Sequence, residues 1–190
     1  YFVLPYTIGD YLSDDIRTGP ISTSSKEFDS AEKEVVDRIN KLVGNKGTNS
    51  VDSYHKKLGK IMWEKCGMAR TENGLKEAMS EIKQLRDDFW ENVSIPGNSS
   101  EMNKELEKAG RVADFLELGE LFAKDALERN ESCGGHFREE YATAEGEAER
   151  DDKGFSYVSA WEYKGEPANA VLHKEDLSFN NIEVKVRSYK

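Results

Sequence analysis

The side chains best suited to chemistry gather in one short segment, residues 130–141, where a carboxylate, a hydroxyl, a thiol, an imidazole and a guanidinium follow one another closely. They belong to Glu131, Ser132, Cys133, His136 and Arg138. A histidine beside a carboxylate can act as a general base, and a serine within hydrogen-bond reach of that base can act as a nucleophile. Between them, Gly134 and Gly135 give the backbone access to positive φ and let another backbone or a ligand come close. The segment is therefore both a candidate site and a candidate helix-ending turn.

The same residues suit a structural turn, in which polar side chains bond to backbone groups. A small hydrolase that uses His136 or His173 with a nearby carboxylate is the chemical alternative, but no oxyanion-hole pattern surrounds Ser132. The three histidines show no HxxxH spacing, and Cys66 and Cys133 form no CxxC pair, so the sequence predicts no metal site and two reduced thiols. It also lacks a glycine-rich dinucleotide fingerprint, so no cofactor-binding site is predicted.

Composition limits the partners. The 190 residues are 34% charged and 37% apolar, with a formal net charge of −10. Phosphate recognition depends on clustered Lys and Arg, so this acidic balance argues against a nucleic-acid partner. The longest apolar run is interrupted by Pro5, and no run approaches the roughly 20 apolar residues that span a bilayer.

Four runs of apolar residues at helical spacing precede the turn and must position it. The predicted N-terminal caps are Asp29 (with Glu32 completing a capping box), Ser50, Thr71 and Ser99 or Ser100. The predicted ends are Gly44, Gly67 and the segment Ile95-Pro96-Gly97. The predicted core positions are Ala31, Val35, Ile39, Leu42 and Val43, then Val51, Tyr54, Leu58, Ile61 and Met62, then Leu75, Ala78, Met79, Ile82, Leu85, Phe89 and Val93, and finally Met102, Leu106, Ala109, Ala113, Leu116, Phe122, Ala126 and Leu127. Because the connections are short, the last three helices are expected to run up, down and up.

After the turn the pattern changes to an acidic loop and then to strands. An aromatic and β-branched run over residues 155–163 and a return at Val171-Leu172-His173 predict a hairpin, and Ile182, Val184 and Val186 alternate with charged residues as a final half-buried strand. The predicted fold is mainly α, an antiparallel three- to four-helix bundle of the spectrin-repeat kind over residues 28–130, followed by a loop and β-rich extension over 131–190 that carries a small β-hairpin or sheet.

The segment from Glu131 to Arg138 resembles the Glu-Ser-Arg-Gly-Ala-His-x-Arg sequence near the C-terminus of the flavoprotein subunits of succinate dehydrogenase and fumarate reductase. Trp161-Glu162-Tyr163 and the final Arg187-Ser188-Tyr189-Lys190 are similar to the tail of the same subunit, most closely in its bacterial three-subunit branch. Glu131, Ser132, Gly134, His136 and Arg138 keep the family pattern. Cys133 replaces an Arg of many members, which removes a planar five-donor fork, and Gly135 replaces an Ala.

The resemblance implies a C-terminal domain of an oxidoreductase that interconverts succinate and fumarate by hydride transfer to FAD. It implies that residues 1–27 are the end of a preceding flavin domain and a linker, and that the catalytic and flavin-binding residues precede Tyr1, so that this chain carries no catalytic, cofactor-binding or metal residue. The implied partners are the flavin-binding domain of the same chain, an iron-sulfur subunit and a membrane-anchor cytochrome b subunit. The implied location is cytoplasmic, peripheral on the cytoplasmic face of the inner membrane. The family-pattern residues Glu131, Ser132, Gly134, His136 and Arg138 are then expected to form an interdomain turn.

A free-standing acidic helical bundle that acts as a protein-interaction module explains the helices and the charge equally well. The length of the intact open reading frame discriminates between this module and a domain of a larger flavoprotein.

Overall fold

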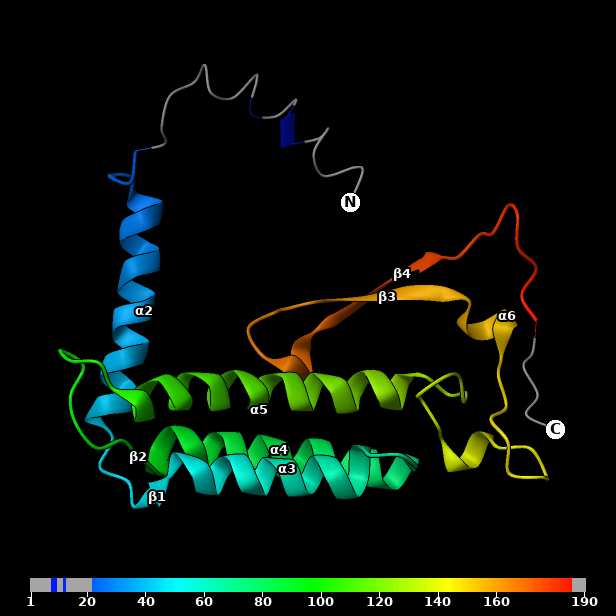
Figure 1. The fold of residues 1–190 in the computed structure, drawn as a ribbon, viewed down its shortest axis with the longest axis horizontal. Helices are drawn as coiled ribbons and strands as arrows, with labels where there is room; N and C mark the ends of the chain where they lie inside the picture. Colours follow the sequence, from blue (N-terminus) through cyan, green and yellow to red (C-terminus); the bar gives the residue numbers. More distant parts are fainter. Residues whose placement is uncertain (1–7, 10–11, 13–21, 186–190) are drawn as a thin grey trace. The chain divides into compact units, whose positions relative to one another are not determined.

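The computed structural model describes residues 8–9, 12 and 22–185 (Figure 1). The chain divides into two compact units, Tyr1–Asn40 and Lys41–Lys190. Of residues 1–27, which the resemblance assigns to the end of a preceding domain and a linker, the structure describes residues 8–9, 12 and 22–27, and the family-like tail Arg187–Lys190 lies outside the described residues.

The first long helix, α2 (Lys26–Gly44), ends at the predicted glycine but begins earlier than predicted. The carbonyl of Ser25 accepts the N–H groups of Phe28 and Asp29 at 3.1 and 3.3 Å, so Asp29 lies inside the first turn. The capping box at Asp29 and Glu32 was therefore a wrong prediction. Leu42 is the buried residue of this helix, and it belongs to the second unit. Val35, predicted as core, is 58% exposed.

The second unit is built on α3 (Val51–Cys66), α4 (Glu72–Asn92) and α5 (Lys104–Glu128). The predicted caps of α3 and α4 are confirmed, since Ser50 accepts from the N–H of Ser53 and Thr71 from that of Gly74. The predicted cap of α5 at Ser99 or Ser100 is wrong. Asn103 caps this helix by accepting from the N–H groups of its first turn. Met102 then precedes the helix and is 96% exposed instead of buried.

The three helices run up, down and up, as predicted (Figure 1). Two short strands, β1 (Asn49–Ser50) and β2 (Val93–Ser94), pair in parallel and so join the start of α3 to the end of α4. Lys108 near the start of α5 donates to Asp52 near the start of α3 at 3.1 Å. Consequently α3 and α5 run in one direction and α4 runs in the other.

The core lies between these helices and matches most of the predicted positions. Its buried members are Leu42, Val51, Tyr54, Leu58, Cys66, Leu75, Ala78, Ile82, Leu85, Phe89, Val93, Ile95, Ala109, Val112, Ala113, Leu116, Ala123 and Ala126. Helices α3 and α5 approach closely at Gly119, where an added Cβ would lie 3.3 Å from Leu58 and 3.4 Å from the sulfur of Met62. Phe122, predicted as core, is 46% exposed because it lies on the outer side of α5.

A buried ion pair crosses this core between α4 and α5. Nη1 of Arg86 lies 2.5 Å from Oε2 of Glu120, and the two residues are only 6% and 2% exposed. Burial raises the pKa of Glu120, and the neighbouring Arg86 guanidinium acts in the opposite direction. The pair therefore links two helices at a point where either charge alone would be unfavourable.

The β-rich extension contains η2 (Glu139–Tyr141), α6 (Asp152–Phe155), β3 (Tyr157–Glu162), η3 (Pro167–Asn169) and β4 (Val171–Asp176). Strands β3 and β4 are antiparallel, with Tyr157 opposite Asp176 and Glu162 opposite Val171, which confirms the predicted hairpin. The predicted final strand is wrong over its described part. Residues 177–185 are irregular, since the described sheet ends at β4 and offers them no neighbouring strand, and Val186 lies outside the described residues.

The hairpin lies alongside α5 (Figure 1), and side-chain hydrogen bonds between the two hold it there. Nζ of Lys124 donates to the carbonyls of Pro167, Ala168 and Ala170 at 2.9 to 3.1 Å. The indole N–H of Trp161 donates to Asp125 at 2.7 Å. Within the described ranges, no helix has the length and apolarity that crossing a membrane requires.

Candidate functional site

The family-like turn follows the end of α5 and closes as a two-residue hairpin. Cys133 and His136 exchange both backbone hydrogen bonds, at 2.8 and 3.0 Å, across Gly134 and Gly135. Gly134 has a φ of +60°, a conformation that strains residues with a side chain. A Cβ at either glycine would have no described atom within 4 Å, so the close approach of another backbone predicted at these glycines is not made by the described residues.

Ser132 closes the base of the turn and is completely buried. Its hydroxyl accepts from the N–H of Arg138 at 2.8 Å and donates to the carbonyl of the same residue at 3.1 Å. Its own N–H donates to the carbonyl of Glu149 at 2.9 Å. The hydroxyl is thus committed to the backbone, and this arrangement speaks against Ser132 as a nucleophile activated by His136.

Arg138 connects the turn to the end of α5, and it is also completely buried. Its Nη1 donates to the carbonyls of Ala126 and Leu127 at 3.1 and 3.3 Å, and its Nε donates to Glu140 at 3.1 Å. Its Nη2 has no hydrogen-bond partner among the described residues, and the guanidinium lies 5.5 Å from the ring centre of Tyr141. A cation that binds the last free carbonyls of a helix satisfies them and also complements the helix dipole.

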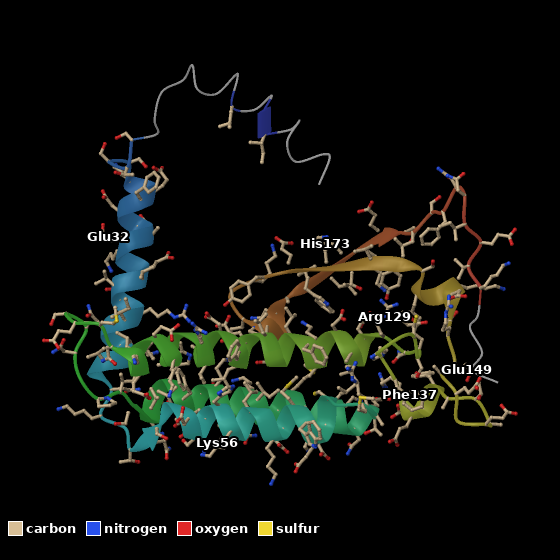
Figure 2. The ribbon with its side chains drawn as sticks, in the orientation of Figure 1. Glu32, Lys56, Arg129, Phe137, Glu149 and His173 are labelled. Atoms are coloured by element: carbon tan, nitrogen blue, oxygen red, sulfur yellow. The ribbon has the colours of Figure 1, made fainter. Side chains whose placement is uncertain are left out.

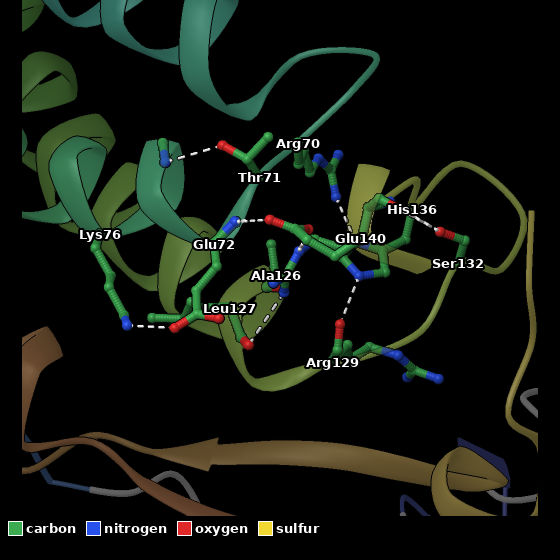
Figure 3. A network of polar contacts seen from close by, with 12 residues as sticks. Arg70, Thr71, Glu72, Lys76, Ala126, Leu127, Arg129, Ser132, His136 and Glu140 are labelled. Carbon is green, nitrogen blue, oxygen red and sulfur yellow. Dashed lines mark hydrogen bonds and ion pairs between the residues drawn. The ribbon is translucent and has the colours of Figure 1, made fainter. Parts of the chain in front are cut away.

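His136 lies between two arginines, as Figure 3 shows. Its Nδ1 lies 2.8 Å from Nη1 of Arg70, and its Nε2 lies 2.9 Å from the carbonyl oxygen of Arg129. A guanidinium can only donate and a carbonyl can only accept, so the imidazole must be neutral and carry its proton on Nε2. Burial lowers the pKa of His136, the bond to the carbonyl of Arg129 opposes this, and the charges of Arg70, Arg138 and Arg129 lower it further.

The same segment also reaches the adjoining ends of α3 and α4. Nε of Arg70 donates to the carbonyls of Cys66 and Gly67, both at 3.2 Å, where α3 ends. The backbone of Arg70 pairs with the chain on either side of Arg138. Oε1 of Glu140 accepts from the N–H of Glu72 at 2.6 Å, where α4 begins. Three helix ends therefore meet the turn, and each receives the charge that its dipole favours.

Glu131 joins the turn to the β-rich extension, and it is 2% exposed. Its two carboxylate oxygens accept from Nη2 of Arg129 at 2.6 Å and from the N–H of Asp151 at 3.0 Å. Figure 2 shows Arg129 where α5 ends. Its Nη2 also donates to the carbonyl of Phe155 at 3.2 Å, and its guanidinium lies 5.8 Å from the ring centre of Tyr157.

All five predicted site residues thus lie in one turn. Sequence reasoning missed three residues that bind them or their neighbours, namely Arg70, Arg129 and Glu140. A sequence signal was available for Arg70, because a basic residue just after a helix commonly binds the last carbonyls, as Arg70 does at the end of α3. Among the described residues no group of three or more His, Cys, Asp and Glu side chains is arranged to hold a metal ion. The polar side chains of the turn and of Arg70, Arg129 and Glu140 bond mainly to one another and to helix ends. We call this group of residues the structural clamp.

Acidification is expected to weaken this clamp. Because the pKa of His136 is lowered from its ordinary value of 6.5, the unfolded chain takes up the proton first as pH falls, and stability is lost below about pH 6.5 but kept above it. The matched variant is His136→Gln, whose amide keeps one donor and one acceptor without titrating. The free energy of unfolding, measured with urea, should fall more between pH 7.5 and pH 5.5 for the unsubstituted chain than for His136→Gln. An equal loss in both proteins would contradict the assignment of a neutral imidazole.

The two thiols are expected to react at different rates. Cys66 is 5% exposed and burial raises the pKa of its thiol, whereas Cys133 is half-buried in the turn. Since the thiolate is the reactive form, Cys133 should react first with an aromatic disulfide reagent and Cys66 only on unfolding. Two free thiols should be counted in denaturant, and equal rates in the folded chain would refute the ordering.

Comparison with known proteins supports a specific family. The family described as the fumarate reductase flavoprotein C-terminal domain matches residues 55–189. This range contains α4, α5, the complete family-like turn, and all of α3 except its first four residues. The fumarate reductase flavoprotein subunit of Helicobacter pylori (strain 26695) is 29% identical over 177 residues, which are 93% of this chain and 24% of that protein. An L-aspartate oxidase of Nostoc is 28% identical over 97 residues, 45% of this chain and 17% of that protein. A structure of E. coli quinol fumarate reductase has a TM-score of 0.72 at 24% identity and covers 85% of this chain and 27% of its own.

The fold and the clamp define a helical domain with a β-hairpin appended to its last helix. The chain belongs to the fumarate reductase flavoprotein C-terminal family. It spans about a quarter of the length of the two Helicobacter pylori relatives that it matches.

Proposed function

We propose that this chain is the C-terminal helical domain of a flavoprotein subunit that interconverts succinate and fumarate by hydride transfer to FAD. The observation that carries the proposal is the family match over residues 55–189, which includes the bundle and the buried turn. The relative from Helicobacter pylori is named a fumarate reductase flavoprotein subunit and matches over 93% of this chain.

In this proposal the domain is structural, and residues 1–27 connect it to a preceding flavin-binding part. A flavin site needs free backbone N–H groups that cradle a pyrophosphate. In the described turn, the N–H groups of Ser132, Cys133, His136 and Arg138 already donate to acceptors of this chain, which supports a structural role for the turn. The residues that bind flavin and substrate are therefore assigned to the preceding part.

We further assign the five turn residues, Glu131, Ser132, Gly134, His136 and Arg138, to the interdomain contact. Two observations support this role. The turn is held rigidly by buried hydrogen bonds, and neither Gly134 nor Gly135 has a described atom near its Cβ position. The proposed external partners are an iron-sulfur subunit and a membrane-anchor cytochrome b subunit, with the complex on the cytoplasmic face of the inner membrane.

The test is the activity of the full-length gene product. The protein should carry flavin and oxidise a reduced viologen dye when fumarate is added, and it should reduce a dye when succinate is added. Because one matching relative is an L-aspartate oxidase, L-aspartate belongs in the same assay. Turnover of L-aspartate without either succinate or fumarate turnover would assign the chain to that activity instead. A native product of about 190 residues without flavin would favour the interaction module.

A further inference from the structure

An apolar groove runs along the outer side of α5 in the second unit. It consists of three adjoining depressions of about 310, 320 and 590 Å³ that all include Leu118. We call it the α5 groove. One side is formed by α3 with Gly59 and Met62, and the other by the hairpin with Val158 and Trp161.

The groove exposes large apolar side chains that a solvated helix rarely gathers. On α5, Phe115, Leu118 and Phe122 are 41%, 60% and 46% exposed, and they recur at positions i, i+3 and i+7 on one helical face. Val158 of β3 is 50% exposed beside them. A contiguous apolar surface of this kind marks an interaction site, whereas single exposed apolar residues are ordinary.

The shape of the groove suits incoming side chains. A Cβ at Gly59 would meet no described atom within 4 Å, so the surface of α3 is open down to its backbone at that position. On the opposite helix, Phe115, Leu118 and Phe122 line the same depression and are all exposed. Hollows that alternate with protruding side chains are the geometry that a packed helix or strand requires.

The groove is continuous with the turn that we assign to the interdomain contact. The guanidinium of Arg70, which binds His136, lies 4.9 Å from the ring centre of Phe122. Arg129, whose carbonyl binds the same histidine, lines the groove next to β3. A partner that contacts the turn can therefore extend over the groove without a break.

We propose that the α5 groove receives an apolar segment of the flavin-binding part of the same chain. This inference rests on the proposed function. The matched relative from Helicobacter pylori is about four times as long as the aligned region, so a chain of that length has a large further part that can cover this groove. Asp114 and Glu117 border the groove, so basic residues are expected to flank the bound segment.

Photo-crosslinking in the full-length protein tests the contact directly. Benzoylphenylalanine is placed at Leu118 in one protein and at Met102 in a control, since Met102 is apolar, 96% exposed and outside the groove. The expected result is a crosslink from position 118 to a peptide that precedes Tyr1, within a monomeric product, and no such crosslink from position 102. A crosslink to residues 1–40, to a second copy or to another protein would overturn the inference, as would a yield no higher than that of the control.

A substitution provides an independent measurement. Leu118→Asp should release flavin from the full-length protein during gel filtration, whereas Met102→Asp should retain it as the unsubstituted protein does. Unchanged flavin retention in Leu118→Asp would contradict the docking. Succinate and fumarate turnover of the unsubstituted protein is measured separately, so a wrong docking face and a wrong proposed function give different results.

Discussion

Replacing Arg138 by alanine is expected to lower the free energy of unfolding of the 190-residue chain by about 3 to 5 kcal/mol. The side chain is completely buried and binds the carbonyls of Ala126 and Leu127 at the end of α5. Its loss leaves both carbonyls without this donor and opens a cavity, and each effect is destabilising. Chemical denaturation monitored by circular dichroism measures the change.

Arg111→Ala is the matched control, because Arg111 lies on the same helix α5 but its side chain is 68% exposed and forms an ion pair with Glu107 one turn away. It should cost no more than about 0.5 kcal/mol. In the full-length protein, Arg138→Ala should also weaken flavin retention through the proposed interdomain turn. The Michaelis constant for succinate of the protein that remains assembled should change little. A stable, fully flavin-loaded Arg138→Ala protein with a many-fold higher constant would place the turn in the active site.

Replacing Arg86 by methionine should be similarly destabilising, by about 3 to 5 kcal/mol, because it leaves Glu120 buried without its partner. The two side chains meet at 2.5 Å between α4 and α5 in an apolar core. The double variant Arg86→Met, Glu120→Leu removes both charges, and it should recover most of the lost stability.

Lys76→Met serves as the control for this pair. Lys76 lies on α4 as Arg86 does, but its side chain is 58% exposed and its partner Glu72 is 55% exposed. The free energy of unfolding of this control should differ from that of the unsubstituted chain by no more than about 0.5 kcal/mol. If Arg86→Met were as stable as the control, the ion pair would not be the link between α4 and α5 that its burial indicates.

Local signals explain which parts of the fold were predictable. Ser50 and Thr71 cap their helices by accepting a hydrogen bond from the backbone N–H three residues later, and such bonds depend only on residues close in sequence. The start of α5 was missed because residues 98–103 contain several side chains able to cap. Asn103 prevails since its amide also donates to the carbonyls of Pro96 and Asn98, a choice made by the folded loop.

The candidate site was predictable as a group of residues but not as an arrangement. The five family-pattern residues lie close together in sequence, so they could be grouped without knowing the fold. Arg70 lies 66 positions from His136, and only packing of the helix ends brings the two together. The prediction of a final strand was wrong because it relied on local sequence alone. Alternation at Ile182 and Val184 is a local pattern, and a strand forms only where a neighbouring strand supplies hydrogen bonds.

We propose that this chain is a folded structural domain of a longer flavoprotein, and flavin absorbance of the two proteins distinguishes this from a flavin-binding domain. The 190-residue chain and the full-length protein are each mixed with FAD and passed through gel filtration, and circular dichroism checks that the short chain melts cooperatively. We predict a folded, colourless 190-residue chain and a full-length protein with bound flavin. A short chain that retains flavin absorbance, or a full-length protein that binds none, would contradict the account.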